Sequence, residues 1–451
     1  MFLNMMQDWA GWLLILFSFS IVLMWKSVRS DTKVVHAIWF CIVLHHAVAL
    51  VNTYVCTVIG ADLDASRFHS TGVALAELPK LEWVVGRFAL GEIIVPVEVS
   101  GHWISESHHN YMNSLGYIYR AFGPSLLLGG ELSVLAFTLS CVVLVRLVSL
   151  LDLERFRIGI ILLFGLLPSA AIFRSVTLRE SWQALFFLLS VYWAIRLRKR
   201  PGIRIFSFVL MSAFCMALLH DGLKGYIMFF LPVCICWGIT FRSRKTVLLE
   251  CYARFLFAGL LVACVIMLIQ KMGWYLTIED ALNRIDNFHQ ASTAKGFLGR
   301  TNFAFPLDAS SALGIVKTIP MVFGQYMFAP FPWQVENVKD ICALLESMLR
   351  FVLLFFAVSS WRRSSGEVRS YYNFLLIIYL GMELLWALGT VNWGTATRHH
   401  VLGHSVIVLL GGPGLILFMR KLQFMKFECR KVSRFQDREK VVKPDPKMNE
   451  F

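Results

Sequence analysis

Long runs of apolar residues alternate with short polar segments along most of the chain. A helix needs about 20 consecutive apolar residues to cross the hydrocarbon core of a bilayer, and several runs reach or approach this length. Flanking Trp, Arg and Lys side chains can extend the shorter runs to the membrane interface. The pattern therefore predicts an all-α, polytopic transmembrane bundle of about eleven spans. The predicted spans cover residues 10–25, 35–59, 124–150, 158–173, 181–195, 205–219, 225–241, 253–271, 343–360, 372–389 and 401–418.

Basic residues concentrate in every second loop between these spans, which predicts an orientation. Lys and Arg are enriched in cytoplasmic loops, so we place these loops and the C-terminus in the cytoplasm and the N-terminus outside it. The basic residues in this set of loops include Lys26, Arg29, Lys33, Arg196, Arg198, Lys199, Arg200, Arg204, Arg242, Arg244, Lys245, Arg362, Arg363, Arg369, Arg420 and Lys421.

The other set of loops predicts a shared extracytoplasmic face with two long segments, residues 60–123 and 272–342. Acidic residues cluster in this set, so chemistry that needs carboxylates is expected there. We assign residues 1–420 to one transmembrane domain and residues 421–451 to a basic cytoplasmic tail. The tail is highly charged, with prolines near its end, which predicts a solvated and partly disordered segment.

The composition argues against a soluble enzyme. The 451 residues are 57% hydrophobic and 16% charged, with a mean hydropathy of +0.64, whereas a soluble domain is about 45–50% apolar and about 25% charged. A net charge of +14 would otherwise indicate nucleic acid, but the positive-inside rule accounts for it, so no nucleic-acid partner is expected. Most cysteines lie in apolar runs and act as small hydrophobes. No metal site is expected, because no standard ligand spacing is present.

Two carboxylates open the first long loop, directly after a predicted span. Asp62 and Asp64 fall at the membrane–water boundary, where partial desolvation makes a carboxylate a better general base. The alternative is structural, because an aspartate can cap an interfacial helix over residues 65–78. The local sequence leaves both interpretations open.

Two short loops on the same face add cations and acids. Arg174 and Arg179 run against the positive-inside trend, and the guanidinium fork suits phosphate oxygens. An Arg179–Glu180 surface pair of little energetic weight is the alternative. Asp221 stands in a His-Asp-Gly turn, and Asp-Gly is a turn signal in its own right.

Further cations follow on the predicted outer face. Arg300 lies in the second long loop, and Arg398 and His399 belong to a basic cluster immediately before the last span. Because topology disfavours cations on this side, the placement of Arg398 and His399 indicates a bound anion.

Four ionisable residues lie within or near the spans, and intramembrane charge is a hint of function. Glu346 and Arg350 are four residues apart, so a structural ion pair on one helix face is the alternative for these two. The four residues are Glu131, Glu346, Arg350 and Glu383.

Several short motifs follow one another between about residues 50 and 400. They are Asp-Ala-x-x-Phe-His at 64–69, Tyr-x-x-x-Leu-x-x-x-Tyr-Arg-x-Phe-Gly at 111–123, Leu-Pro-Ser…Arg-Glu at 167–180, Ala-Pro-Phe-Pro-Trp at 329–333 and Gly-Thr-Ala-x-Arg-His at 394–399. In this order they resemble the bacterial members of the GT-C superfamily. These are polytopic glycosyltransferases that use polyprenyl-phosphate-linked sugars, with related repeat-unit polymerases (the O-antigen polymerase type) of surface-polysaccharide and exopolysaccharide assembly.

The resemblance implies a GT-C-like fold and transfer of a sugar to an acceptor hydroxyl at the outer face of the bacterial inner membrane. It places Asp64, with Asp62 as second candidate, at the site of transfer and basic residues of other outer loops at the lipid phosphate. The residues that we assign to substrate or phosphate binding are Arg174, Arg179, Glu180, Asp221, Arg300, Arg398 and His399.

The implied partners are a lipid-linked sugar or oligosaccharide on a polyprenyl (undecaprenyl type) phosphate, membrane lipid and other glycan-assembly proteins. No cofactor is specified, and a role for a divalent cation stays open. The chain departs from the family by an extra N-terminal span and the lack of a large C-terminal soluble domain.

Two functions of other classes compete with this one. A transporter or flippase of lipid-linked sugars would show repeated halves and polar residues near the bilayer midplane, and the sequence shows neither clearly. A non-catalytic subunit of a glycan-synthesis complex would need no outer acids and arginines. The two long outer loops favour catalysis at one face.

The first prediction is topological. Cysteine or glycan-acceptor tags at about residues 65, 300 and 395 should be labelled from outside the cell, and tags at about 200, 243 and 365 from the cytoplasm, because basic loops stay cytoplasmic. Labelling with a membrane-impermeant reagent measures this. A tag at 395 that is labelled only from the cytoplasm would contradict the shared outer face.

Overall fold

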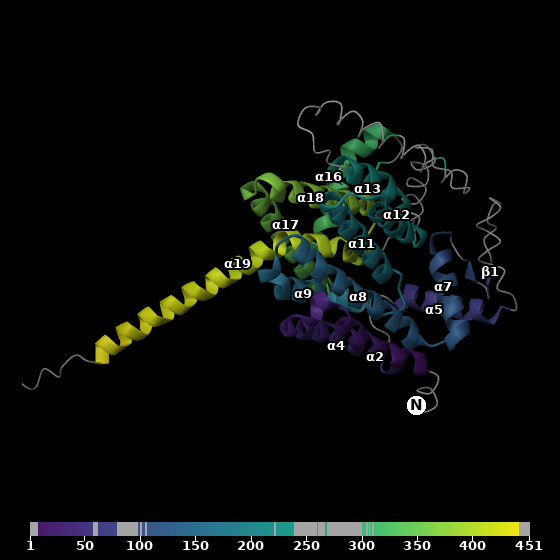
Figure 1. Cartoon of the computed structure of the whole chain (residues 1–451), viewed down its shortest axis with the longest axis horizontal. Helices are drawn as coiled ribbons and strands as arrows, with labels where there is room; N and C mark the ends of the chain where they lie inside the picture. The colour runs from purple at the N-terminus through teal and green to yellow at the C-terminus, as the bar shows by residue number, and fades with distance from the viewer. Residues whose placement is uncertain are drawn as a thin grey trace, which may run out of the picture.

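The structure is a computed structural model of the chain (Figure 1). It describes residues 8–56, 62–78, 98–99, 102–103, 106–220, 222–238, 259, 267, 300–303, 305, 307–308 and 311–441. Asp221, nearly all of the predicted span 253–271 and parts of both long loops lie outside these residues.

Helices make up nearly all of the described chain, which confirms the predicted all-α class. The one two-stranded sheet among the described residues is a short antiparallel pair, β1 (Glu98–Val99) and β2 (His102–Trp103). Two 3-10 turns, η1 (Glu154–Phe156) and η2 (Pro332–Gln334), connect helices. The α-helices are α2 (Trp9–Met24), α3 (Lys26–Arg29), α4 (Thr32–Tyr54), α5 (Asp62–Glu77), α7 (Glu106–Phe122), α8 (Leu126–Leu150), α9 (Arg157–Gly165), α10 (Pro168–Phe173), α11 (Glu180–Lys199), α12 (Ile203–Leu218), α13 (Gly222–Gly238), α16 (Ala312–Phe328), α17 (Val338–Arg363), α18 (Gly366–Leu388) and α19 (Trp393–Val441).

Five helices in the described part of the chain are long and apolar enough to cross a membrane. They are α4, α8, α17, α18 and the portion Trp393–Leu422 of α19. Three shorter apolar helices, α2, α12 and α13, accompany them. The predicted number of eleven spans is not confirmed.

The predicted span 158–173 is divided into two helices. Pro168 stands at the start of α10, and α9 ends at Gly165. Proline has no N–H to continue the hydrogen-bond ladder, and its ring clashes with the preceding turn. The apolar run is therefore continuous in sequence but interrupted in the fold.

The outward face of α17 is apolar. Leu345, Met348, Phe351 and Phe355 each expose more than half of their surface, and their spacing puts them on one side of the helix. A contiguous exposed patch of this kind is typical of contact with lipid or another protein. The patch agrees with the length and composition of α17 as a membrane-spanning helix.

Polar contacts join the ends of neighbouring helices at both ends of the bundle. At one end, the Tyr54 hydroxyl donates to Asp8 over 2.6 Å, and Ser125 also donates to Asp8. At the other, Lys199 donates to the Leu150 carbonyl over 2.5 Å. We call the first the loop end, where α5 and α7 lie, and the second the tail end, where α19 leaves the bundle (Figure 1).

One helix was missed in the predicted outer loop 272–342. α16 contains Pro320 in its interior, along with glycines and a lysine that interrupt the apolar pattern. It begins where the Ser311 hydroxyl accepts a hydrogen bond from the Gly314 N–H over 3.0 Å, a standard N-terminal cap. Its residues therefore belong to the helical bundle and not to a loop.

The last helix extends beyond the last predicted span into the C-terminal tail. α19 continues as one helix to Val441 and projects away from the bundle (Figure 1). The predicted tail thus contains helix as far as Val441. Neither Gly nor Pro occurs between Gly414 and Val441, so the sequence provides no terminator before Pro444.

α8 lies at the centre of the bundle, with α2 and α4 on one side and α11 on the other (Figure 1). Its N-terminal turn contains Gly129 and Gly130. A Cβ atom at Gly130 would lie 2.9 Å from the Ser175 carbonyl oxygen. The absence of these side chains lets residues 174–179 pack directly on α8, which positions the start of α11.

The packing of α19 on α17 generates a stability prediction. A Cβ atom at Gly411 would collide with the Leu353 backbone carbonyl, whereas one at Gly412 would meet only side-chain atoms at 3.5 Å or more. We expect Gly411→Ala to lower the free energy of unfolding by about 1–3 kcal/mol. Gly412→Ala should be neutral or stabilising, because alanine favours helix by up to about 1 kcal/mol.

Thermal unfolding of the purified protein in detergent micelles measures both variants. Equal melting temperatures for Gly411→Ala and Gly412→Ala would show that the close α17–α19 contact does not exist.

Candidate functional site

Three helices meet at the loop end through one arginine. The Nη1 group of Arg398 donates a hydrogen bond to Asp64, and its Nε lies 3.1 Å from Glu180 Oε1. Arg398 and Asp64 are 334 positions apart in the sequence. The guanidinium thus lies between two carboxylates that come from α5 and α11.

The position of each side chain follows from where its helix begins. Glu180 is the first residue of α11 and Asp64 the third residue of α5, and carboxylates are favoured in the first turn by the helix dipole. Arg398 stands in the second turn of α19, where the dipole disfavours a cation. The two carboxylates offset that penalty.

The side chains of Glu180, Arg398 and Asp64 differ in how much of their surface is exposed to solvent. The Glu180 side chain is 2% exposed, that of Arg398 15% and that of Asp64 44%. The site is therefore sealed at Glu180 and open at Asp64. A ligand that reaches it from solvent meets Asp64 first.

Asp64 does not cap its helix. α5 begins at Asp62, two residues before Asp64, so the capping alternative is wrong for this residue. One partner of Asp64 is the Arg398 side chain, from the opposite end of the sequence. Of the Asp62 side chain nothing is described, since only its backbone is placed, at the first position of the helix.

Arg179 adds a second cation beside Glu180. Its guanidinium lies 5.7 Å from the centre of the Phe68 ring, a cation–π distance, and its Nη1 donates to the Leu219 carbonyl over 3.2 Å. The side chain is buried. Arg179 and Glu180 therefore form part of the interior and not the exposed surface pair that the sequence left open.

Two tyrosines of α7 lie next to these residues. Burial raises the pKa of Tyr111 well above its ordinary value, with neighbouring Tyr119 and Glu180 adding to the rise and Arg179 opposing it. Burial also raises the pKa of Tyr119, whose hydroxyl lies 2.9 Å from His69 Nδ1. Both phenols therefore stay protonated at neutral pH.

Sequence reasoning missed Phe68, Tyr111 and Tyr119 as site residues. Each falls inside a quoted motif, at 64–69 or 111–123. They carry no charge at neutral pH, whereas the site prediction was based on charged residues of the outer face. Their places within these motifs were the available signal.

Two of the remaining predicted residues face elsewhere. His399 is buried, with its ring 3.9 Å from that of Trp386 and its Nδ1 2.9 Å from the Thr390 hydroxyl. Arg174 is also buried and donates to the Val401 carbonyl over 2.8 Å. Burial lowers the pKa of Arg174 to about 9, which still leaves it protonated at neutral pH.

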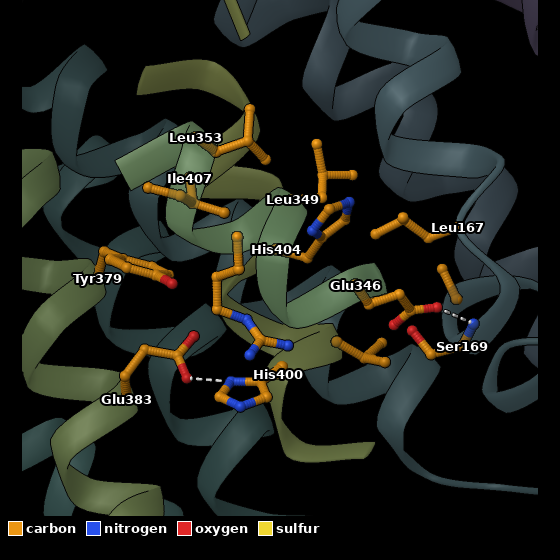
Figure 2. Close-up of a pocket in the computed structure, with 13 residues that line it drawn as sticks. Leu167, Ser169, Glu346, Leu349, Leu353, Tyr379, Glu383, His400, His404 and Ile407 are labelled. Carbon is orange, nitrogen blue, oxygen red and sulfur yellow. Dashed lines mark hydrogen bonds and ion pairs between the residues drawn. The ribbon is translucent and has the colours of Figure 1, made fainter. Parts of the chain in front are cut away.

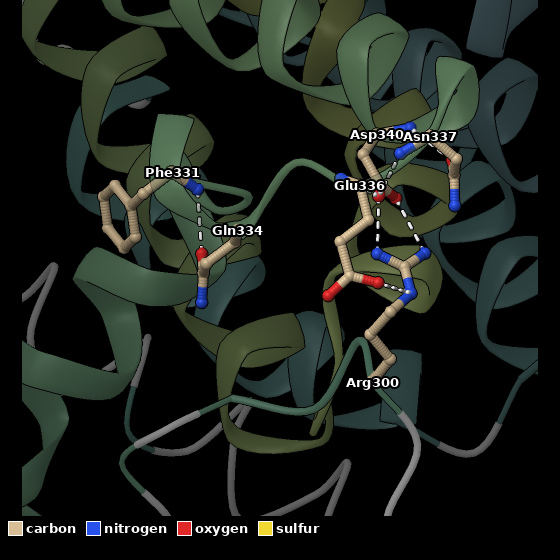
Figure 3. Close-up of polar contacts among 6 residues, drawn as sticks. All are labelled: Arg300, Phe331, Gln334, Glu336, Asn337 and Asp340. Carbon is tan, nitrogen blue, oxygen red and sulfur yellow. Dashed lines mark hydrogen bonds and ion pairs between the residues drawn. The ribbon is translucent and has the colours of Figure 1, made fainter.

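Arg300 belongs to a separate cluster, shown in Figure 3. It makes a two-pronged ion pair with Asp340, with Nη2 3.1 Å from Oδ1, and its Nε lies 3.3 Å from Glu336. The Asp340 carboxylate also accepts from the backbone N–H of Glu336 over 3.0 Å and that of Asn337 over 3.3 Å. These contacts hold Arg300 to the start of α17.

A polar cavity lies deeper in the bundle (Figure 2). Glu383 Oε2 and His400 Nδ1 are 2.6 Å apart, and Glu346 accepts from the Ser169 N–H over 2.7 Å. Arg350 also lines this cavity and donates to the Met327 carbonyl. Glu346 and Arg350 therefore share a cavity, but they do not form the ion pair that their spacing allowed.

Asp221 lies outside the described residues, so its place relative to the site is not defined. Within the described ranges, no three His, Cys, Asp or Glu side chains gather as a metal site requires. The site at the loop end is thus built from Asp64, Glu180 and Arg398, with Arg179 next to them.

Comparison with protein-family models finds no match. Comparison with curated proteins finds no match either. Fold and site alone define the class: a helical protein with several potential membrane spans and a carboxylate–guanidinium–carboxylate cluster at one end.

The burial of Glu180 generates a prediction about stability. Arg398→Met removes the cation and leaves the Glu180 carboxylate without it, which typically costs about 3–5 kcal/mol for a buried pair. The double variant Arg398→Met, Glu180→Gln should recover part of this loss, because the buried charge is removed as well. Thermal unfolding in detergent measures both. If the double variant is no more stable than the single one, Arg398 does not compensate Glu180.

Proposed function

We propose that the protein is a membrane glycosyltransferase or repeat-unit polymerase that takes its sugar from a polyprenyl-phosphate-linked donor. The observation that carries this proposal is the meeting of Asp64, Glu180 and Arg398 at the loop end. A general base and a phosphate-binding cation are the two groups that such a transfer needs. They lie beside helices long enough to span the membrane that would hold the lipid.

The proposed step is a displacement at the anomeric carbon. The acceptor hydroxyl attacks that carbon, its proton passes to the Asp64 carboxylate, and the bond to the donor phosphate oxygen breaks. The polyprenyl phosphate leaves with the electron pair. Arg398, with Arg179 behind it, stabilises the charge that develops on the leaving phosphate.

The ion pair between Asp64 and Arg398 is the resting state in this proposal. A carboxylate held by a guanidinium is a poor base, since the paired charge favours the ionised form. A donor phosphate would compete for the Arg398 donors and release Asp64 toward the acceptor. Asp64 would thus become an active base only when the donor is bound. This limits hydrolysis of the donor by water in place of transfer to the acceptor.

Transport of lipid-linked sugars is the second candidate function, and one observation favours it. Glu346, Glu383 and His400 are ionisable groups within or close to helices that could span a membrane, and such groups mark transport pathways in many carriers. The cavity that they line is nevertheless too small for a sugar. Movement of a labelled lipid-linked sugar across vesicles without transfer would support this candidate.

The decisive test of the catalytic proposal is Asp64→Asn. Asparagine keeps the size and can accept the Arg398 hydrogen bond, but it does not take up a proton as a base. Activity should fall by about 10²–10⁴-fold, the usual contribution of general base catalysis. Stability should change by no more than about 1 kcal/mol, the typical value of a first-turn carboxylate. Sugar transfer from a purified polyprenyl-linked donor measures the activity.

Asp62→Asn is the matched control, because it removes the same charge from the same helix turn. A folded Asp64→Asn protein with normal transfer would exclude Asp64 as the base. Equal losses in both variants would assign the effect to charge and not to proton transfer.

A further inference from the structure

The cavity in the bundle contains two acids, one guanidinium and two imidazoles. Glu346 and Arg350 come from α17, Glu383 from α18, and His400 and His404 from α19. Figure 2 shows Glu383 and Tyr379 on one side and Glu346 with Ser169 on the other. With both acids ionised and both imidazoles neutral the cluster would carry a net negative charge, which is unfavourable in a low-dielectric interior.

The hydrogen bonds of His400 show where a compensating proton lies. Its Nε2 is 3.0 Å from the Tyr326 carbonyl oxygen, which can only accept, so Nε2 carries a hydrogen. Its Nδ1 is 2.6 Å from Glu383 Oε2. That contact needs a second proton, carried either by Nδ1 or by the carboxyl group. The pair as a unit therefore holds one proton more than a neutral imidazole and a carboxylate.

Unpartnered polar atoms surround this pair. Glu383 Oε1 and the Tyr379 hydroxyl are buried without a hydrogen-bond partner among the described residues. The cavity offers about 20 Å³ to the centres of water molecules, enough for one water and too little for a sugar or phosphate. Water is thus the ligand that the cavity fits, and a water there lies next to the pair and can accept its proton.

We propose that the Glu383–His400 pair is an exchangeable proton-binding site inside the membrane domain, served by water in the adjoining cavity. When the proton leaves, it passes to this water and on to the solvent. The pair is then left with a net negative charge beside Arg350, the cation on the opposing helix. No oxidant, metal or other reactant is needed.

Every element packed around the pair contributes groups that tune it. α16 brings Tyr326, α18 brings Tyr379, and α17 brings Glu346 and Arg350, of which only Arg350 favours loss of the proton. Along α19, His404 Nε2 lies 3.0 Å from the Leu163 carbonyl oxygen, which can only accept, so Nε2 carries a hydrogen. The other ionisable groups near this stretch are Arg174, Arg398 and the neighbouring imidazole His399.

The bundle contains a second, matched pair. His46 Nδ1 and Glu131 Oε2 are also 2.6 Å apart and buried, on α4 and α8. His46 Nε2 has no partner among the described residues, and neither residue lines the cavity. We therefore expect this pair to lack the exchange path, which makes Glu131→Gln a control for burial alone.

The test counts protons on purified protein in lipid nanodiscs. A step from about pH 6 to about pH 9 in weak buffer, followed with a pH-sensitive dye, should release about one proton more per chain from the wild type than from Glu383→Gln. Infrared difference spectra of the same step should show carboxyl or imidazolium bands that Glu383→Gln loses. The exposed Glu367→Gln, on the same helix, and the buried Glu131→Gln should keep them.

Equal proton release from the wild type and a folded Glu383→Gln protein would overturn the proposal. Wild-type protein labelled with ¹³C at glutamate carboxyls and ¹⁵N at histidine tests it without any variant. If no labelled band changes across the pH step, the pair does not exchange its proton. None of these readouts involves sugar transfer, so the result is independent of the proposed catalytic function.

Discussion

The guanidinium of Arg398 holds together three helix beginnings that are far apart in the sequence. Glu180 is buried at the start of α11 and needs a compensating charge, because an unpaired carboxylate in the interior is strongly unfavourable. Arg398 provides that charge only if α19 begins where it does. The segment before α19 is fixed in turn by backbone pairing, with the Trp393 N–H bonded to the Thr301 carbonyl over 3.1 Å. The loop end is therefore built around one guanidinium that connects the beginnings of α5, α11 and α19.

The same constraint acts throughout the apolar interior, where ionisable side chains must find partners within the protein. Two solutions recur. Imidazole–carboxylate pairs bind His46 to Glu131 and His400 to Glu383. Arg174 instead donates to a backbone carbonyl and lies 4.2 Å above the Phe164 ring. A cation held by a ring face and a carbonyl needs no acid, which explains how an arginine is tolerated there.

Sequence patterns were sufficient for the helical class and for several individual helices. The apolar runs at α4, α8 and α18 are long and contain few charged residues, so their length identified them. The pattern failed where a single residue changes the backbone. Pro168 divides one run into α9 and α10, and Pro320 lies inside α16, where the sequence suggested a loop.

For the site, sequence reasoning identified charged residues but not their partners. Asp64, Glu180 and Arg398 were chosen separately, from an acidic loop and from cations on the disfavoured side of the membrane. Their contact depends on how three helices pack, and no local pattern encodes it. The proton that we propose on the Glu383–His400 pair is even harder to predict from sequence, because it is inferred from which atoms accept hydrogen bonds.

A comparison of Arg300 with Arg398 explains why only one of these arginines suits a ligand. Asp340 is 4% exposed and shares its oxygens between Arg300 and two backbone N–H groups at the start of α17. A phosphate that took Arg300 would leave a buried carboxylate uncompensated and would disturb the beginning of that helix. Asp64 is 44% exposed and is bound through Nη1, so water can solvate its carboxylate when Nη1 turns to another anion while Nε stays with the buried Glu180. The difference in burial, more than the number of charges, separates a structural ion pair from one that can open for a substrate.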